Sequence, residues 1–257
     1  MNTSLPQQHL HDMDEKSWWD YWNTSYRTED GIDEISTELF ERAAAVVNSI
    51  TAGRSARILE IGCGTGSFSR LLLHYSAYHG IDISPAAIEL ARHKSVRLPG
   101  GSQPSYEAAD FHDWAAPPEA FDIVICIDAV AYFRDQQLAL SKMAASLRPS
   151  GTVVLTTINP FVYNRIRRTS SRPLQEGSVS RWLSRSELHS LIHSAPLALE
   201  RSLTIMPRGN RGILRLINSP RLNRAFGHSF ANTLKRHKES VGLGQYRLVV
   251  AHKSARA

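Results

Sequence analysis

Short apolar runs alternate with amphipathic segments through the middle of the chain. The run at 121–127 is almost continuously apolar, whereas the segment at 32–50 carries apolar residues three and four positions apart. This alternation is typical of βαβ units and predicts an α/β fold with a doubly wound, mostly parallel sheet. The seven strands that we expect cover residues 57–61, 78–82, 105–109, 121–127, 152–158, 197–206 and 244–252.

Helix start signals separate these runs. Ser84 and Pro85 supply an N-cap and a first-turn proline, and Asp135 is the expected cap of a later helix. Ser184-x-x-Glu187 has the spacing of a capping box. The helices that we expect cover residues 15–27, 32–50, about 66–75, 84–94, 135–147, 184–193, about 213–217 and 222–237.

Two segments depart from the alternation. Residues 159–183 lack clear periodicity, and residues 207–241 separate expected strands six and seven, although a hairpin needs only a few residues. The second segment has apolar side chains that need burial, so we predict a helical cap inserted between strands six and seven, over the ligand edge of the sheet. These apolar residues are Ile213, Leu214, Leu216, Ile217, Leu222, Phe226, Phe230 and Leu234.

The stretch 57–66 joins an apolar strand to a glycine turn. Glycine adopts positive φ without strain and lets a ligand approach the backbone, and a following helix presents free N–H groups. Such a turn fits a dinucleotide fingerprint, a plain βα turn or a nucleoside site of another kind. Two details favour the last of these. Glycines occupy every second position after Glu60, unlike the dinucleotide spacing, and Asp82 ends the next run, where a carboxylate can accept hydrogen bonds from ribose.

These motifs resemble those of the class I S-adenosylmethionine-dependent methyltransferases that act on small molecules. The stretch from Glu60 to Gly66 is similar to the first motif of that family, and Asp82 is similar to its second acid. The resemblance implies a Rossmann-like methyltransferase fold, with S-adenosylmethionine as cofactor and S-adenosylhomocysteine as its product. The cofactor-binding residues that it implies are Trp22, Tyr26, Glu60, Gly62, Cys63, Gly64, Gly66, Asp82, Ile83, Asp110, Phe111, Asp128 and Ala129.

We therefore expect a single methyltransferase domain over residues 1–257. Its expected parts are N-terminal helices at 14–50, a cofactor-binding core at 55–158, substrate-lid insertions at 159–183 and 207–241, and the end of the sheet at 184–206 and 242–253.

Three residues after expected strands have more than one interpretation. The resemblance implies that Asp110 accepts a hydrogen bond from the adenine amine beside Phe111, but Asp110 could instead cap a helix. Asp128, after the strand at 121–127, could hold the methionine ammonium or orient an acceptor. Tyr132 could line the acceptor site, be catalytic or simply pack.

Aromatic residues recur before the sheet begins. Trp18, Trp22 and Tyr26 follow a spacing of four residues, which places them on one face of a helix. They could pack onto the domain or, as the resemblance implies for Trp22 and Tyr26, cover the cofactor site.

The charge of the chain is divided unevenly. Residues 1–159 hold 12 Lys+Arg and 20 Asp+Glu (−8), and residues 160–257 hold 18 and 4 (+14), which together give +6. The basic part is either a solvated surface or a site for an anionic partner, such as nucleic acid, a membrane surface, a phosphorylated metabolite or an acidic carrier protein. We predict a basic lid that selects an anionic acceptor, with Arg211 and Arg215 as substrate residues.

Histidine side chains are candidates for two roles, a general base and a metal site. His228 and His237 in the expected cap are base candidates because imidazole titrates near neutrality, although a plain surface role fits both. His189 and His193 have a spacing that zinc sites use, but without a third ligand nearby we expect solvent-facing side chains and no metal.

Composition points to a reducing compartment. The only cysteines, Cys63 and Cys126, lie in the glycine turn and in an apolar strand, which argues against a disulfide framework. No apolar run approaches the length of a membrane span, and residues 1–15 lack a signal-peptide core. We expect a cytoplasmic protein.

Three functions remain to be compared. The first is transfer of a methyl group from S-adenosylmethionine to an oxygen or nitrogen of a small, biosynthetic acceptor, free or bound to a carrier. The second is methylation of RNA, DNA or another anionic macromolecule, which the basic part favours but the sequence Asp128-Ala129-Val130-Ala131 does not. The third is a scaffold without turnover, against which the intact acids Glu60, Asp82 and Asp110 argue.

Overall fold

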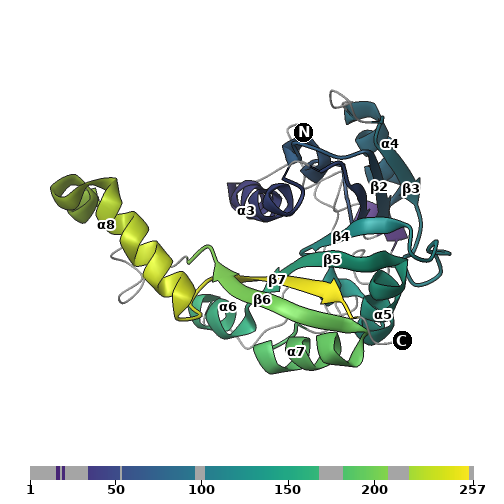
Figure 1. Ribbon diagram of the computed structural model, residues 1–257. Helices are drawn as coiled ribbons and strands as arrows, with labels where there is room; N and C mark the ends of the chain where they lie inside the picture. The colour runs from purple at the N-terminus through teal and green to yellow at the C-terminus, as the bar shows by residue number, and fades with distance from the viewer. Residues whose placement is uncertain are drawn as a thin grey trace.

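A twisted sheet of seven strands forms the centre of the molecule (Figure 1). The computed structural model describes residues 16–17, 19–20, 34–52, 54–95, 102–167, 182–207 and 220–254. The strand order is β3-β2-β1-β4-β5-β7-β6. The strands are β1 Arg57–Ile61, β2 Ala77–Asp82, β3 Ser105–Ala108, β4 Phe121–Ile127, β5 Leu147–Ile158, β6 Leu197–Ile205 and β7 Tyr246–Lys253.

The sheet is parallel from β3 to β5, and β7 pairs antiparallel with both of its neighbours. This confirms the predicted doubly wound, mostly parallel fold. The strand order reverses between β1 and β4, and ligands of open α/β sheets bind at the carboxyl ends of the strands beside such a point. We call this side of the sheet the ligand edge.

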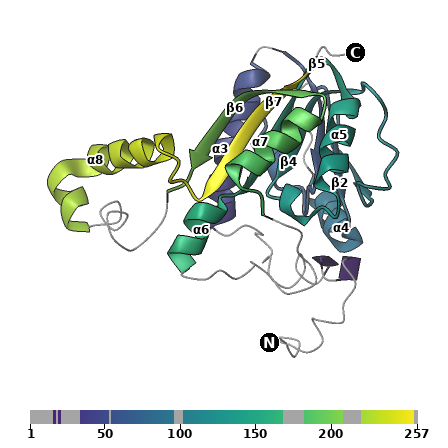
Figure 2. The same cartoon turned by 90° about the horizontal axis from the view of Figure 1, so that it is seen from below.

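Helices cover both faces of the sheet, and each face has its own apolar cluster. One face packs against α3 (Glu34–Ile50) and α4 (Pro85–Lys94), and the other packs against α5 (Gln136–Ser146) and α7 (Arg185–Ser194). Figure 2 shows α3 and α7 on opposite sides of the β6–β7 hairpin. β4 is buried along most of its length, as its unbroken apolar sequence predicts, because both faces are covered.

The predicted helix caps are present. Ser84 accepts a hydrogen bond from the amide of Ala87, and Asp135 accepts one from the amide of Leu138. Ser184 and Glu187 form the reciprocal bonds of a capping box at the start of α7.

The helix predicted at about 66–75 is shorter than expected. Only a 3₁₀ helix forms there, η1 (Phe68–Leu71), because the side chain of Asn48 on α3 takes over the backbone groups that a longer helix would use. Asn48 Nδ2 donates to the carbonyl of Leu71 at 3.0 Å, and Asn48 Oδ1 accepts from the amide of Leu73 at 2.9 Å. The expectation that a long helix aims its N-terminus at the ligand was therefore wrong.

Two boundaries after β4 also differ from the prediction. β5 begins at Leu147, whereas the expected strand began at residue 152, and its early part includes Ser150 at φ 62°. The stretch that lacked periodicity begins with a helix, α6 (Pro160–Arg167), whose first turn is closed by hydrogen bonds from the amides of Val162 and Tyr163 to the carbonyl of Asn159.

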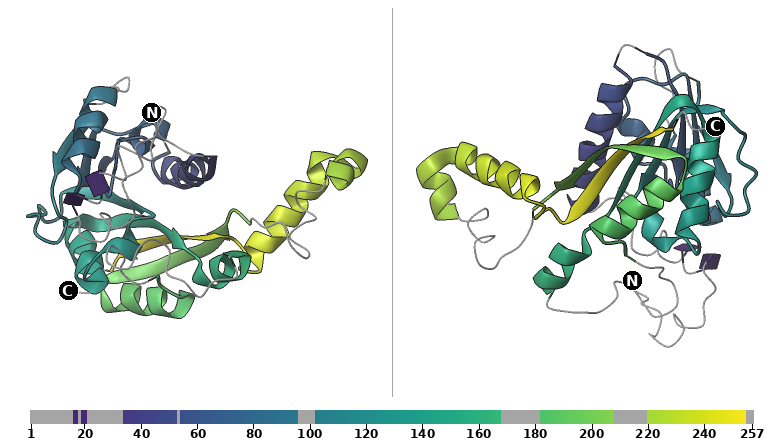
Figure 3. Two further views of the ribbon diagram at one scale, coloured as in Figure 1. Left: turned by 180° about the vertical axis from the view of Figure 1, so that it is seen from behind. Right: turned by 60° about the horizontal axis from the view of Figure 1, so that its bottom comes forward.

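Helix α8 (Pro220–Ser240) lies between β6 and β7 in the chain, as predicted. Figures 1 and 3 show it extending away from the body of the molecule, which differs from the expected position over the ligand edge. Its last turn is attached to the sheet through Glu239, which accepts from the amide of Met206 at 3.2 Å and pairs with Arg42 of α3 at 3.5 Å. Residues 168–181 and 208–219 of the predicted lid lie outside the described residues, so the lid stays a prediction.

Candidate active site

The glycine turn after β1 is tightly bound to the end of β2. Gly62, Gly64 and Gly66 all have positive φ, between 52° and 73°. The amides of Gly62 and Cys63 both donate to the carbonyl of Ile81, at 2.8 and 3.0 Å. The turn therefore requires glycine for its backbone conformation.

Two of these glycines are also required by close packing against protein atoms. A Cβ on Gly62 would lie 2.5 Å from the Cβ of Ala129, which follows β4. A Cβ on Gly66 would lie 2.9 Å from the hydroxyl oxygen of Tyr106 on β3. The sequence suggested that ligand approach requires these glycines, but the structure shows that contacts among β1, β3 and β4 already require them.

Asp82 links the ends of β1 and β2. Its Oδ2 accepts from the amide of Gly64 at 2.8 Å, and its Oδ1 accepts from the amide of Ser84 at 3.0 Å. Ile83 beside it is half-buried. A carboxylate oxygen has more than one lone pair, so this arrangement leaves acceptor capacity on Asp82 for further donors.

Glu60 lies inside the sheet and not on its surface. Its side chain is 1% exposed and accepts a hydrogen bond from the hydroxyl of Tyr78 on β2. Burial, and then the charge of Glu60, raise the pKa of Tyr78 well above its usual value. The hydroxyl of Tyr78 therefore stays protonated and donates to the buried carboxylate.

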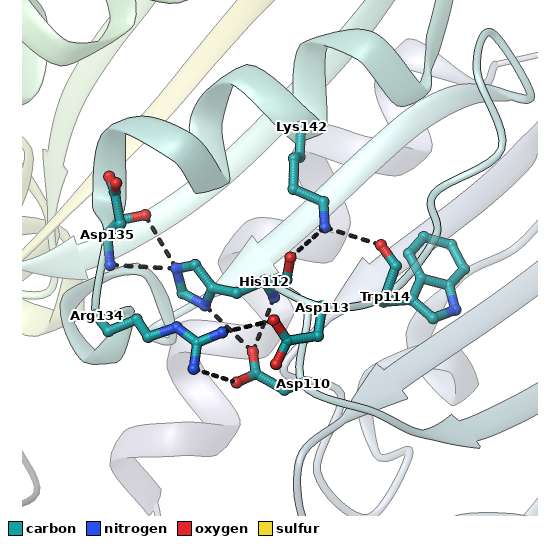
Figure 4. Close-up of polar contacts among 7 residues, drawn as sticks. All are labelled: Asp110, His112, Asp113, Trp114, Arg134, Asp135 and Lys142. Atoms are coloured by element: carbon teal, nitrogen blue, oxygen red, sulfur yellow. Dashed lines mark hydrogen bonds and ion pairs between the residues drawn. The ribbon is translucent and has the colours of Figure 1, made fainter.

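Asp110 caps a turn after β3, and not a helix as the alternative interpretation of the sequence had it. Its Oδ1 accepts from the amide of His112 at 2.8 Å, and its Oδ2 lies 3.3 Å from Nη1 of Arg134 (Figure 4). Arg134 also pairs with Asp113 at 2.8 Å. Each oxygen of Asp110 can accept a further hydrogen bond, as the predicted adenine role requires.

The same network fixes the turn after β3 against α5. Nε2 of His112 lies 3.1 Å from the carbonyl oxygen of Asp135, and Lys142 donates to the carbonyls of His112 and Trp114 at 2.7 and 2.8 Å (Figure 4). Phe111 is 4% exposed, under the ammonium of Lys142. Neither His112 nor Lys142 was predicted as a functional residue, because the bonds that join this turn to the start of α5 and to Lys142 link residues more than 20 positions apart in the sequence.

The turn after β4 has an unusual backbone. Asp128 has a φ of 55°, and its amide donates to both the carbonyl and the hydroxyl oxygen of Thr156 on β5. A positive φ on a residue other than glycine is uncommon and is concentrated at functional sites. Ala129 contacts the glycine turn, so the ends of β1 and β4 meet here.

Tyr132 follows in a short 3₁₀ helix, η2 (Val130–Tyr132). Burial, and then the charge of Asp128, raise the pKa of its hydroxyl. At neutral pH Tyr132 is therefore a hydrogen-bond donor and not a general base.

The N-terminal segment reaches the ligand edge, through residues that the sequence did not single out. The ring of Trp19 lies edge-on to Tyr132, with 4.9 Å between centroids. Asp20 accepts hydrogen bonds from the hydroxyl of Ser84 and from the amide of Ala86, at the start of α4. Trp22 and Tyr26, the predicted contacts, lie outside the described residues.

Of the predicted substrate and base residues, the structure places Tyr132 at this edge and His237 away from it. Arg211, Arg215 and the side chain of His228 lie outside the described residues. His237 is exposed near the end of α8, beside β6. Three strand steps separate β4 from β6, or roughly 14 Å at about 4.8 Å per step. In the described part of the chain, no group of His, Cys, Asp and Glu side chains could hold a metal ion.

The donor and acceptor chemistry of the edge fits S-adenosylmethionine. Asp82, Asp110 and Asp128 end or follow the neighbouring strands β2, β3 and β4, on both sides of the glycine turn. Ionised carboxylates only accept hydrogen bonds. The ribose hydroxyls, the adenine amine and the ammonium group of the cofactor are all donors.

A comparison with protein families identifies the fold family. The model of the family described as "Methyltransferase domain" matches residues 25–201. The chain belongs to this family. It is a class I S-adenosylmethionine-dependent methyltransferase by family, as the motifs around Glu60 and Asp82 predicted.

Curated relatives of this methyltransferase domain match over part of their length. A malonyl-[acyl-carrier protein] O-methyltransferase of Paenibacillus sp. (strain JDR-2) is 29% identical over 138 residues, which is 51% of this chain and 50% of the relative. A ubiquinone biosynthesis O-methyltransferase of Xanthomonas campestris is 33% identical over 106 residues, which is 40% of this chain and 44% of the relative. The chain thus spans about half the length of these relatives or less.

Solved structures match over nearly the whole methyltransferase chain. The complex between the Haloferax volcanii Trm112 methyltransferase activator and a protein described as a methyltransferase has a TM-score of 0.63 at 17% identity, and covers 95% of this chain and 99% of that one. This likeness supports the fold. Among the described residues, the structure has no helix long and apolar enough to cross a membrane.

Proposed function

We propose that this protein transfers a methyl group from S-adenosylmethionine to an oxygen or nitrogen of a small-molecule acceptor. The observation that carries the proposal is the set of three carboxylates at the ends of β2, β3 and β4, on both sides of the glycine turn that follows β1. A plain βα turn would not require three acceptors facing one edge. Both cysteines are buried and neither forms a disulfide, which supports the predicted cytoplasmic location.

Each residue has a role that its position supports. Asp82 would accept from the ribose hydroxyls, Asp110 would accept from the adenine amine, and Asp128 would hold the methionine ammonium. Gly62 and Ala129, in contact with each other, would bring the backbone against the sulfonium end. Trp19 and Asp20 support a covering role for the N-terminal segment, because they contact both sides of this edge.

The sulfonium of the cofactor supplies an activated methyl group, so the protein needs mainly to position an acceptor. Alignment of the acceptor with the methyl group can lower the barrier by several kcal/mol. The raised pKa of Tyr132 makes its hydroxyl a donor that orients an acceptor oxygen or nitrogen. A proton released by the acceptor would then pass to solvent or to another base.

The acceptor class rests on the relatives. The curated relatives named above act on ubiquinone precursors or on a malonyl group carried by acyl-carrier protein, by their names. We therefore favour a small acceptor, free or carrier-bound. No described residue favours methylation of RNA or DNA over this function.

Calorimetry with S-adenosylhomocysteine tests the cofactor proposal. Asp82→Ala should weaken binding by roughly 10- to 100-fold, because a charged acceptor is lost. Asp113→Ala is the matched control, since Asp113 is an exposed carboxylate that pairs with the outer side of Arg134. Binding of NAD in place of the homocysteine product would refute the proposal.

A product search tests the acceptor. The protein and S-adenosylmethionine are incubated with metabolite extract or with RNA, and mass spectrometry looks for the added methylene mass. Methylated nucleosides without methylated metabolites would replace the small-molecule function by the nucleic-acid one.

A further inference from the structure

An arginine is buried in the sheet without an acidic partner. Arg247 on β7 is 8% exposed, and its Nη1 donates to the hydroxyl of Ser202 on β6 at 3.4 Å. Among the residues that the structure describes, no carboxylate lies within ion-pair distance of it. A buried cation without an anion is costly, since it has lost its hydration.

Other polar groups near Arg247 also lack partners. Thr157 on β5 is directly opposite Arg247 in the antiparallel register, so both side chains point to the face covered by α7. The Oγ1 of Thr157 and the Nε2 of His189 on α7 are buried, and neither has a hydrogen-bond partner. His189 was predicted to face solvent, and the structure corrects this: only His193 of the pair is exposed.

A second arginine completes the cluster. Arg185 begins α7 and lies one helical turn before His189, which places both on one side of the helix. Burial, then Arg185 and Arg247, lower the pKa of His189. Burial and then Arg185 lower the pKa of Arg247. Arg185 is therefore near both His189 and Arg247, and a positive charge on any of the three side chains is unfavourable for the others.

We propose that Arg185, His189 and Arg247 bind the oxyanion of a phosphate or carboxylate group, with the hydroxyl of Thr157 as a further donor. The planar guanidinium of Arg247 matches two oxygens of such a group. This site differs from the lid arginines that the sequence suggested. It is independent of the cofactor residues, which lie on other strands.

The position of the site places the anion near the ligand edge. Thr157 is the last residue but one of β5, and α7 begins at the same edge. Two strand steps separate β4 from β7, or roughly 10 Å at about 4.8 Å each. The oxyanion therefore belongs either to a free ion or to the charged end of an acceptor whose reacting atom is near Asp128.

Binding of inorganic phosphate to the full chain, by calorimetry and by thermal unfolding, tests the site. Sodium chloride at equal ionic strength controls for screening. The wild type should bind phosphate with a Kd of about 1 mM or tighter and unfold at a higher temperature in its presence. Arg185→Gln should weaken phosphate binding by at least about tenfold, and it should cost little stability because Arg185 is exposed.

Two further variants separate the site from general charge effects. Arg247→Met should lose the phosphate response while unfolding, without phosphate, at the wild-type temperature or above it, because it removes a buried unpaired charge. Arg201→Gln removes a positive charge from β6 on the opposite face, in register with Val250, and should respond to phosphate as the wild type does. Equal responses from Arg247→Met and Arg201→Gln, or no phosphate binding by the wild type, would overturn the proposal.

Phenyl phosphate distinguishes the two sources of the oxyanion. A site for a free ion should bind inorganic phosphate more tightly than the ester, whereas a site for the end of an acceptor should bind the ester at least as tightly. Binding of S-adenosylhomocysteine is measured in parallel and should be unchanged in all three variants. If the protein bound phosphate but not S-adenosylhomocysteine, the proposed function would be refuted, and the oxyanion site at Arg185, His189 and Arg247 would still be supported.

Discussion

The charged side chains at the two ends of the ligand edge differ in whether they have partners within the protein. At the end formed by β1 to β4, Glu60 and Asp82 accept hydrogen bonds from neighbouring segments, and Asp110 accepts one within its own turn. At the end formed by β5, β7 and β6, the cation Arg247 has only a long bond to a serine hydroxyl. Buried polar groups usually have partners, so the exceptions call for an explanation.

This difference indicates how each end would bind a ligand. The acids are already fixed by the protein, and a ligand would add donors to side chains held in position. The cluster of Arg185, His189 and Arg247 has no carboxylate paired with Arg247 among the described residues, and under our proposal a ligand would supply the negative charge. The acidic first part and the basic last part of the sequence thus correspond to two different places on one edge.

The largest effect is expected from adding a Cβ to the glycine turn. Gly62→Ala should lower the free energy of unfolding by roughly 2–5 kcal/mol, from the positive φ and the contact with Ala129. Gly242→Ala, near the β7 end, has a similar φ of 83° but nothing within 4 Å, so it should cost about 1–2 kcal/mol. Urea unfolding measures both. Equal losses would mean that the glycine turn is not tightly packed.

Removing one hydroxyl at each end should have opposite results. Tyr78→Phe takes the donor from buried Glu60 and should cost about 1–3 kcal/mol of unfolding free energy. Thr157→Val removes a buried hydroxyl that has no partner and should be neutral or stabilising. A large loss of stability for Thr157→Val without any added anion would contradict the comparison.

The pH dependence of stability, compared between the wild type and Tyr78→Phe, gives a second test of the bond between Tyr78 and Glu60. The folded pKa of Tyr78 is raised, so its contribution to stability is complete below the unfolded pKa of about 10 and is lost as pH rises above it. The wild type should therefore lose stability more steeply than Tyr78→Phe above about pH 10, by up to about 1.4 kcal/mol per pH unit. Parallel curves would argue against the bond between Tyr78 and Glu60.

The smallest effect is expected from exposed ion pairs. Arg134→Gln and Arg201→Gln each break a pair whose arginine is more than half exposed, so each should cost at most about 1 kcal/mol. Only Arg134→Gln should also change the affinity for S-adenosylhomocysteine, modestly, because Arg134 pairs with Asp110. Calorimetry with both variants checks this. An unchanged affinity would favour a purely capping role for Asp110.

Local patterns in the sequence determined most of the sheet and its edge. Apolar runs predicted every strand to within a few residues, except that β5 begins five residues early, at Leu147. The Ser84 and Asp135 caps and the capping box at Ser184 were predicted correctly because each depends on residues within one helical turn. The glycine turn with Asp82 was recognisable for a similar reason, since its backbone requirements are local.

Only the tertiary structure decided the features that depend on partners distant in sequence. Asn48 ends η1 from another helix, and Trp19 and Asp20 contact residues more than 60 positions away. Glu239 attaches α8 to β6 and to α3. His189 and Arg247 become neighbours because α7 packs on the β6–β7 hairpin, and their spacing in the sequence carries no sign of it. Side-chain charge is visible in a sequence, but whether a charge has a partner depends on three-dimensional proximity.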